Sequence, residues 1–392
     1  MGTIPAILTV VSGLVGLVWL VRHVSLLVGG GVPEGLGHDA PGPPAEAPRV
    51  SVLLAAKDER ETIGPCLRSL LAQDYPDLEI VVVDDRSADG TGEVAAEVAA
   101  SDPRVKLITV ETLPDGWCGK NHALWLAGRA ASGSWLCTID ADCRQTSTRS
   151  LSVALAYARA GDVDMLSILP ALKMEGFWEN VVQPVCGAVL VYWYRPQRVN
   201  DPARPAAYAN GAFMLIRREV YDAVGGHEAI RGAMMEDLRL ARRVKGAGYR
   251  LRVLRNEGLY EVRMYPSLAD TLAGWSRIFW GAFPTRRRLR VTMIALALMS
   301  LSPYVLGGWS WLAWLAGGSD GWLAAAGAAT AAVVLQITFV ARLYPLLNAP
   351  RGLCWTWPLG CVLALGALIR AYRFHGPGRS IVWRGTAYRT GG

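Results

Sequence analysis

The sequence lacks several patterns that define common classes of protein. No Gly-x-Gly-x-x-Gly follows the first expected strand and no Gly-x-x-x-x-Gly-Lys-Ser/Thr loop is present, which argues against dinucleotide-dependent dehydrogenases and P-loop ATPases. The seven cysteines have no paired spacing, so we expect reduced, buried thiols rather than disulfides. No basic-aromatic surface or recognition module is apparent, which argues against nucleic acid as a partner.

The chain is more apolar than an ordinary soluble enzyme. It has 392 residues, of which 52% are hydrophobic, and its mean hydropathy is +0.24. The formal net charge is +7, and much of the excess lies beside apolar stretches. These arginines are Arg286, Arg287, Arg288, Arg290, Arg370, Arg373, Arg379, Arg384 and Arg389. Such clusters suit anionic lipid headgroups, so we expect a membrane as a partner.

Four apolar segments are candidates for membrane-spanning helices. Residues 4–27 are long enough to cross a bilayer, and a cleaved signal peptide is the disfavoured alternative because no basic residue precedes the run. Residues 291–315, 322–340 and 353–369 form a second apolar region. The domains expected are a transmembrane helix (1–30), a Gly/Pro-rich linker (31–48), a central domain with interfacial helices (49–285), transmembrane segments (286–370) and a basic tail (371–392).

The arginines at 286–290 indicate that the central domain lies on the cytoplasmic side of a membrane. If residues 353–369 cross, the basic tail lands on the opposite side, against the positive-inside tendency. If they only dip into the bilayer or lie at its surface, the tail stays on the cytoplasmic side. We prefer the second topology, because the segment is short and contains Pro358.

The central region alternates between expected strands and expected helices. The strands are residues 49–56, 79–83, 105–110 and 134–139, and the helices are residues 61–73, 91–100 and 121–131. This alternation predicts an α/β domain with a mostly parallel sheet and helices on both faces. Residues 179–193 are either an interfacial helix or a buried core helix.

Acidic residues follow three of the expected strands. Asp58, Asp85 and the pair Asp140 and Asp142 all come just after a strand end. Because ligands of such sheets bind beyond the carboxyl ends of the strands, we expect these carboxylates to meet in one crevice. Two carboxylates one residue apart, as in Asp140-Ala-Asp142, can share a divalent cation and the diphosphate that it holds.

Two further features are open to two interpretations. Lys120 stands just before an expected helix, where a lysine and free backbone N–H groups suit a diphosphate, and a solvated loop lysine is the alternative. Glu236 and Asp237 form a third acidic site, and the alternative is a helix whose first turn carries favourable acids.

Six stretches of the central region carry motifs in a fixed order: residues 52–59, 73–76, 83–91, 140–142, 211–218 with 224–227, and 236–238. Together they resemble the inverting nucleotide-sugar glycosyltransferases of family 2, which have a GT-A fold. The resemblance covers residues 50–281, and the flanking spans are also similar. It implies a Rossmann-like nucleotide-sugar domain flanked by transmembrane helices. Residues 116–120, 179–201 and 382–388 are most similar to the hopanoid-associated and carotenoid members.

The resemblance implies a role for each residue on the donor side. Asp85 would accept a hydrogen bond from the nucleobase imide, which favours uridine over guanosine. Lys57, Asp58 and Glu59 would border the base or the ribose, and Lys120 would approach the diphosphate. Asp142 would be the main ligand of a Mg²⁺ or Mn²⁺ ion, with Asp140 holding the metal or the ribose.

On the acceptor side, the resemblance makes Asp237 the general base, with Glu236 as its neighbour. The acceptor group would be a hydroxyl or a carboxyl group on a lipid. A hydroxyl must lose its proton during attack, so a carboxylate is needed on the face opposite the leaving group. Residues near the acceptor would be Trp193, Arg277, Trp280 and His227. Trp280 is alternatively an interfacial anchor. His227 is open to two interpretations: a turn histidine that follows two glycines, or a residue that contacts metal or phosphate.

One departure from the family bears on the reaction. Processive polymerases carry Gln/Arg-x-x-Arg-Trp, whereas residues 276–280 here are Ser-Arg-Ile-Phe-Trp. We therefore expect transfer of one sugar, from a nucleotide sugar to a lipid such as a hopanoid or carotenoid, by an integral protein of the bacterial inner membrane whose catalytic domain faces the cytoplasm. The alternatives are a processive polysaccharide synthase and a non-catalytic membrane protein that binds nucleotide sugars.

Overall fold

The computed structural model of the chain describes residues 2–28, 33–42, 46–375, 380–383 and 386–389. The described residues group into a sheet unit, mainly within residues 33–173 and 191–264, and a helical unit of residues 2–28, 174–190 and 265–375. Two of the expected tail arginines, Arg379 and Arg384, lie outside the described residues, as do residues 31, 32 and 43–45 of the expected linker.

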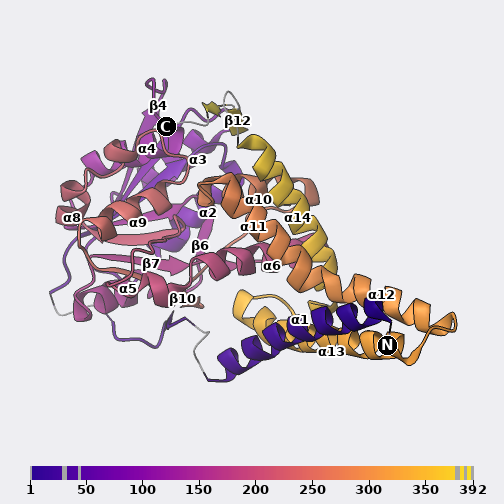
Figure 1. The fold of residues 1–392 in the computed structure, drawn as a ribbon. Helices are drawn as coiled ribbons and strands as arrows, with labels where there is room; N and C mark the ends of the chain where they lie inside the picture. Colours follow the sequence, from indigo (N-terminus) through magenta and orange to yellow (C-terminus); the bar gives the residue numbers. More distant parts are fainter. Residues whose placement is uncertain (1, 29–32, 43–45, 376–379, 384–385, 390–392) are drawn as a thin grey trace. The chain divides into compact units, whose positions relative to one another are not determined.

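The larger sheet of the described residues has eight strands, most of which run parallel to their neighbours (Figure 1). In spatial order they are β1 (Gly35–Gly37), β10 (Leu251–Glu257), β7 (Met165–Leu169), β9 (Phe213–Arg217), β5 (Trp135–Asp140), β2 (Val50–Ala56), β3 (Leu78–Asp85) and β4 (Val105–Val110). The predicted α/β class with a mostly parallel sheet is confirmed.

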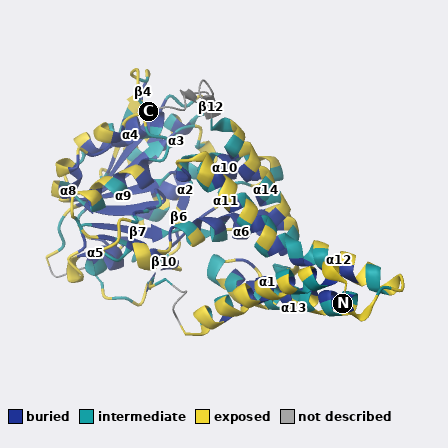
Figure 2. Ribbon diagram, in the orientation of Figure 1, coloured by how far each residue is buried: buried dark blue, intermediate teal, exposed yellow. Residues whose placement is uncertain are grey.

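The central strands are apolar on both faces because helices cover both (Figure 2). Val52 and Leu54 of β2 pack in one cluster with residues of α2 (Arg60–Leu71), α3 (Thr91–Ser101) and α5 (Ser150–Ala160). Leu53, which points to the opposite face, packs with residues of α4 (Gly119–Ala130), α8 (Arg218–Ala223) and α9 (Glu236–Gly246).

Two features of the sheet differ from the expected arrangement. Strand β9 is antiparallel to both of its neighbours, β5 and β7. Strand β1 lies inside the stretch expected as a linker and pairs with β10. The remaining elements of this unit are the short sheet of β6 (Cys143–Gln145), β11 (Tyr260–Val262) and β8 (Ala171–Leu172), the helices α7 (Pro196–Val199) and η1 (Glu228–Ile230), and the terminal hairpin of β12 (Ser380–Trp383) and β13 (Thr386–Arg389).

The helical unit contains the apolar segments. Its helices are α1 (Thr3–Leu27), most of α6 (Phe177–Trp193), α10 (Leu268–Ala282), α11 (Arg286–Leu296), η2 (Ala297–Leu301), α12 (Ser302–Leu315), α13 (Asp320–Leu343), η3 (Tyr344–Leu347), η4 (Arg351–Thr356) and α14 (Trp357–Phe374). Four continuous helices in the described part of the chain are long and apolar enough to cross a membrane: Thr3–Leu27, Arg286–Leu315, Asp320–Leu347 and Arg351–Phe374. The last is longer than the segment expected from the sequence, because Pro358 stands in its first α-helical turn, where proline is tolerated.

The second of these four helices contains the π-helical turn η2. Side chains of neighbouring helices donate hydrogen bonds to two of its backbone carbonyl oxygens. Trp19 Nε1 of α1 donates to Met299 O at 2.9 Å, and Gln336 Nε2 of α13 donates to Ser300 O at 3.2 Å. An apolar surrounding offers no water to irregular backbone, so these side chains satisfy it.

Candidate active site

The candidate site lies at the carboxyl ends of three adjacent strands, β5, β2 and β3. In the sheet register Ala55 of β2 is opposite Asp140 of β5, and Ala56 is opposite Asp84 of β3. The loops that follow these strands are therefore neighbours, as expected for ligand-binding loops of a parallel sheet.

Hydrogen bonds join the loop after β2 to the loop after β3. Lys57 Nζ donates to the backbone oxygens of Asp85, at 3.2 Å, and Arg86, at 2.9 Å. Asp58 Oδ1 accepts from Ala88 N at 3.0 Å, and Glu59 N donates to Thr91 Oγ1 at 2.8 Å. Lys57, Asp58 and Glu59 thus lie beside the Asp85 loop.

Asp85 is held by its neighbour in the chain. Arg86 Nε lies 2.8 Å from Asp85 Oδ1, and Arg86 Nη2 lies 3.0 Å from Asp85 Oδ2. Arg86 also has a positive φ of 58°, in the left-handed region of the backbone. A side chain at Gly119, the first residue of α4, would overlap the Asp85 carboxylate, so Asp85 lies against the start of that helix. Sequence analysis did not identify Arg86.

Lys120 joins two of the three acidic sites. Its Nζ lies 2.6 Å from Asp140 Oδ1 and 2.5 Å from Glu236 Oε1. Burial lowers the pKa of Lys120, but the charges and hydrogen bonds of the two carboxylates outweigh it and leave the pKa well above its usual value. The lysine side chain is 22% exposed and that of Glu236 only 6%, so the ammonium can also meet a ligand.

Asp237 lies beside this ion-pair cluster and is almost fully buried. Its Oδ2 accepts from Gly211 N at 3.1 Å, and its Oδ1 accepts from Leu238 N at 2.6 Å. Burial and the charge of Glu236 together raise the pKa of Asp237 to about 7, although the charge of Lys120 and the two backbone hydrogen bonds lower it. A carboxyl group that titrates near neutral pH is suited to accept a proton during a reaction.

Gly211 permits the close approach of these groups. A Cβ at this position would lie 2.9 Å from Glu236 Oε1 and 3.1 Å from Lys120 Nζ. The segment that leads into β9 therefore passes directly against the cluster, and only a glycine leaves both side chains where they are.

Asn121 fixes the loop that precedes α9, a role that sequence analysis missed. Its Nδ2 donates to the backbone oxygens of Ile230 (2.7 Å), Arg231 (3.1 Å) and Ala233 (2.8 Å). Asn121 is fully buried and follows Lys120 directly. Glu236 and Asp237 are thus positioned from α4. The sequence did offer one indication of this role: Asn121 stands in the first turn of an expected helix, directly after the candidate binding residue Lys120.

His227 lies in the core of the sheet unit and is fully buried. Its Nδ1 is 2.8 Å from the Tyr221 hydroxyl. Burial lowers the pKa of His227 to about 3, and the nearby charge of Lys120 contributes, so the ring is neutral. This environment favours the structural alternative over a contact with metal or phosphate.

The other expected acceptor residues fall in different parts of the chain. Trp193 is in the sheet unit, where its ring lies 5.8 Å from that of Tyr192. Arg277 and Trp280 are on α10 in the helical unit, and the Trp280 ring lies 5.8 Å from that of His375. The structure therefore brings together Asp85, Lys120, Asp140, Glu236 and Asp237, and Arg277 and Trp280 belong to another unit.

Among the described residues, no group of three or more His, Cys, Asp or Glu side chains is arranged to hold a metal ion. Asp140 is paired with Lys120, and Asp142 Oδ1 lies 3.9 Å from Cys143 Sγ. The carboxylates of the Asp140-Ala-Asp142 turn are thus two oxygen donors, not a complete cage of protein ligands.

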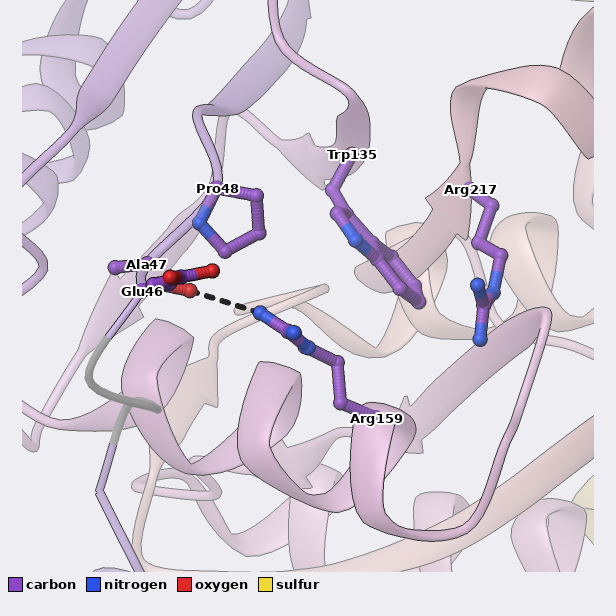
Figure 3. A pocket seen from close by; sticks show the side chains of 6 residues that line it. All are labelled: Glu46, Ala47, Pro48, Trp135, Arg159 and Arg217. Atoms are coloured by element: carbon purple, nitrogen blue, oxygen red, sulfur yellow. Dashed lines mark hydrogen bonds between the residues drawn. The ribbon is translucent and has the colours of Figure 1, made fainter.

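A surface pocket lies at the opposite end of the central strands from the candidate site (Figure 3). Its lining comes from the start of β5, the end of the antiparallel β9, the segment before β2 and α5: Glu46, Ala47, Pro48, Trp135, Arg159 and Arg217. Trp135 and Arg217 are paired in the register of β5 and β9, which places the pocket at the amino ends of the parallel strands. It is separate from the site around Lys120.

The fold is that of GT-A glycosyltransferases. Over 94% of this chain and 97% of the other, it is similar to the mannosyltransferase PcManGT from Pyrobaculum calidifontis, solved in complex with GDP-Man and Mn²⁺, with a TM-score of 0.54 and 20% sequence identity. Residues 51–225 match the family described as glycosyl transferase family 2.

Two curated relatives with the same enzyme name are similar to this chain. The chain is 25% identical to the 4,4'-diaponeurosporenoate glycosyltransferase of Staphylococcus aureus (strain USA300) over 262 residues, which are 66% of this chain and 68% of the relative. The protein of the same name from strain MRSA252 is 24% identical over 249 residues, which are 62% of this chain and 64% of that relative. The family match and these relatives agree with the resemblance expected from the sequence.

Proposed function

We propose that this protein is a membrane-bound glycosyltransferase that transfers one sugar from a nucleoside diphosphate sugar to the hydroxyl group of a lipid. The observation that carries the proposal is the cluster in which Lys120 joins Asp140 to Glu236 beside the buried Asp237. Within a family 2 domain, this cluster supplies a cation for the donor and a carboxylate for the acceptor.

On the donor side, the joined loops after β2 and β3 form the nucleotide site. Asp85 offers its carboxylate to the imide of a uracil, in exchange for or in addition to its contacts with Arg86. Lys57 holds the backbone of the same loop. Lys120 is partly exposed and lies at the start of α4, where its charge and the helix dipole both stabilise a diphosphate.

The donor set of Asp140 and Asp142 fits a Mg²⁺ or Mn²⁺ ion that takes its remaining ligands from the diphosphate and from water. Mg²⁺ in phosphate-transferring sites is commonly held by one or two carboxylates together with substrate phosphates. Such an ion would stabilise the charge that develops on the leaving nucleoside diphosphate. The Mn²⁺ bound to the similar mannosyltransferase supports this assignment.

On the acceptor side, Asp237 would take the proton of the attacking hydroxyl. Its two backbone hydrogen bonds orient the carboxylate, and its burial keeps water away from it. Attack from the face opposite the leaving group inverts the anomeric configuration. The four long apolar helices of the described residues and the carotenoid-related name of the relatives support a lipid acceptor and a membrane location. The arginines at 286–290 support an inner-membrane orientation with the site on the cytoplasmic side.

The test is donor turnover by the detergent-purified full chain. Uridine- and guanosine-diphosphate sugars are incubated with Mn²⁺ and with a bacterial lipid extract, and released nucleoside diphosphate and glycolipid are measured. Asp237→Asn is expected to keep donor binding and to lose transfer. Asp222→Asn, an exposed acid on α8, is the matched control and should remain active. An absence of turnover with every donor, or full transfer by Asp237→Asn, would contradict the proposal.

A further inference from the structure

Two tyrosines stack beside the candidate base. The rings of Tyr194 and Tyr208 lie 5.1 Å apart at an interplanar angle of 27°. Tyr208 stands three residues before Gly211, whose backbone N–H donates to Asp237. The chain that carries one member of the pair therefore runs straight into the candidate active site. Nothing in the proposed roles described above uses this pair.

The loop between the two tyrosines is anchored from α9. Lys245 Nζ donates to the backbone oxygens of Val199, Asp201 (2.9 Å) and Ala206 (2.8 Å). Asp237 is in the first turn of α9 and Lys245 is in its last. One helix thus fixes both the candidate base and the loop that ends in Tyr208.

A second anchor ties the same loop to the sheet. The Asn200 side chain donates to Val253 O at 3.0 Å and accepts from Val253 N at 2.7 Å, in the manner of an added strand residue. These contacts involve residues 199–201, the end of the stretch 179–201 that resembles the hopanoid-associated and carotenoid members. They also mean that the tyrosine pair is held in a defined place before any ligand binds.

The hydroxyl and the ring of Tyr208 have different surroundings. The hydroxyl is hydrogen-bonded by the Asn210 side chain, and burial together with the charge of Asp237 raises its pKa. The ring stacks on Tyr194, which is 6% exposed, while Tyr208 itself is half-buried. The hydroxyl of Tyr208 is thus close enough to Asp237 to be influenced by its charge, and the Tyr208 side chain is partly exposed.

The aromatic surface continues along the chain into α6. Tyr192 and Trp193 end this apolar helix, their rings lie 5.8 Å apart, and Tyr192 is 47% exposed. Tyr194 follows directly. Rings of this kind combine a large apolar area with a polar edge and suit a boundary between hydrocarbon and water.

We propose that the ring of Tyr208, backed by the buried ring of Tyr194, forms one wall of the acceptor site and binds the hydrocarbon carbons next to the reacting hydroxyl of a lipid alcohol. This inference rests on the proposed function. It makes Tyr208 a residue that determines acceptor specificity, because a soluble sugar acceptor would present hydroxyl groups to this apolar ring.

The test uses primary alcohols from butanol to decanol as acceptors for the detergent-purified full chain. In the wild-type protein, each added methylene should lower the acceptor KM about threefold, as expected for burial of apolar surface. Tyr208→Ala should weaken this dependence on chain length, whereas Tyr208→Phe, which keeps the ring, should retain it. Partition of the alcohols into micelles is the same for each variant, so the comparison between variants is unaffected. Tyr249→Ala, just beyond the far end of α9, is the control.

A second measurement does not depend on turnover. Decanol bearing a photoreactive diazirine is crosslinked to the protein, and labelled peptides are mapped. Labelling of residues 192–208 that is lost in Tyr208→Ala supports the inference even if no donor is consumed, in which case the proposed transfer alone fails. The inference would be overturned if residues 192–208 were not labelled, or if Tyr208→Ala kept the wild-type dependence on chain length. It would also be overturned if Tyr208→Ala lost nucleoside diphosphate binding to the same extent as alcohol binding.

Discussion

Lys120 Nζ lies 2.5 Å from Glu236 Oε1, and this contact joins the first turns of α4 and α9. Both helices point their positive ends at the same place, which favours the carboxylates gathered there and favours a phosphate as well. The single charge of the lysine also offsets one of the two negative charges of Asp140 and Glu236, which reduces their repulsion of an anionic donor.

Removing this ammonium should therefore affect both stability and binding. Lys120→Met leaves Asp140 and the buried Glu236 without their shared partner, so we expect a loss of about 2–4 kcal/mol in the free energy of unfolding. Affinity for a nucleoside diphosphate should fall at least about tenfold. Chemical denaturation and isothermal titration measure the two effects. Lys120→Arg, which keeps the charge, should recover much of the stability, and equal losses in both variants would contradict this account.

The metal assignment predicts a different phenotype for the acidic turn after β5. Asp142→Ala should abolish the Mn²⁺-dependent part of nucleoside diphosphate binding and leave the metal-independent part, because Lys120 and its contacts are untouched. Titration with and without Mn²⁺ separates the two parts. Asp115→Ala, in the exposed loop before α4, serves as the control. Undiminished Mn²⁺ dependence in Asp142→Ala would remove this residue from the metal site.

The raised pKa of Asp237 predicts a pH dependence of defined sign. The folded protein keeps the Asp237 proton up to a pH of about 7, whereas the unfolded chain loses it near the ordinary carboxyl value. The folded state therefore binds more protons in that interval, and Asp237 lowers stability as pH rises through it. Asp237→Asn should match the wild type in acid and exceed it by about 1–3 kcal/mol above neutral pH. Denaturation at several pH values checks this, and a constant difference between the two proteins would show that Asp237 ionises normally.

Much of the fold could be predicted from the sequence, because the apolar strands and the helical spacing of residues 61–131 are local signals. The antiparallel direction of β9 could not, because a short apolar run such as Phe213–Arg217 has the same composition in either direction. At the site, strand ends indicated Asp85 and Asp140. The contacts of Asn121 with Ile230 and Ala233 could not be predicted, because they join backbone positions that only the folded loop before α9 brings together.

A side chain at Gly211 should disturb the ion-pair cluster of Lys120 and Glu236. In Gly211→Ala, the new Cβ would lie 2.9 Å from Glu236 Oε1 and 3.1 Å from Lys120 Nζ, so the cluster must shift. We expect a cost of about 1–3 kcal/mol in unfolding free energy and a larger relative loss of transfer. Gly246→Ala on α9 meets no atom within 4 Å and should leave both quantities nearly unchanged. Similar behaviour of the two variants, in denaturation and in transfer assays, would mean that the cluster is less closely packed than described.

Asn121 should act on catalysis through position. Asn121→Ala removes the donor to three backbone oxygens of the loop before α9, and we expect a loss of about 2–3 kcal/mol in stability because those oxygens lose a buried partner. Since the loop leads into Glu236 and Asp237, kcat should fall about tenfold or more while the KM for the donor changes less. Steady-state kinetics with donor and acceptor varied separately distinguish the two constants. Arg129→Ala, at the exposed end of the same helix, should keep kcat within about twofold, since no loop carbonyl depends on it. A fall in donor affinity with unchanged kcat would place Asn121 on the nucleotide side of the site instead.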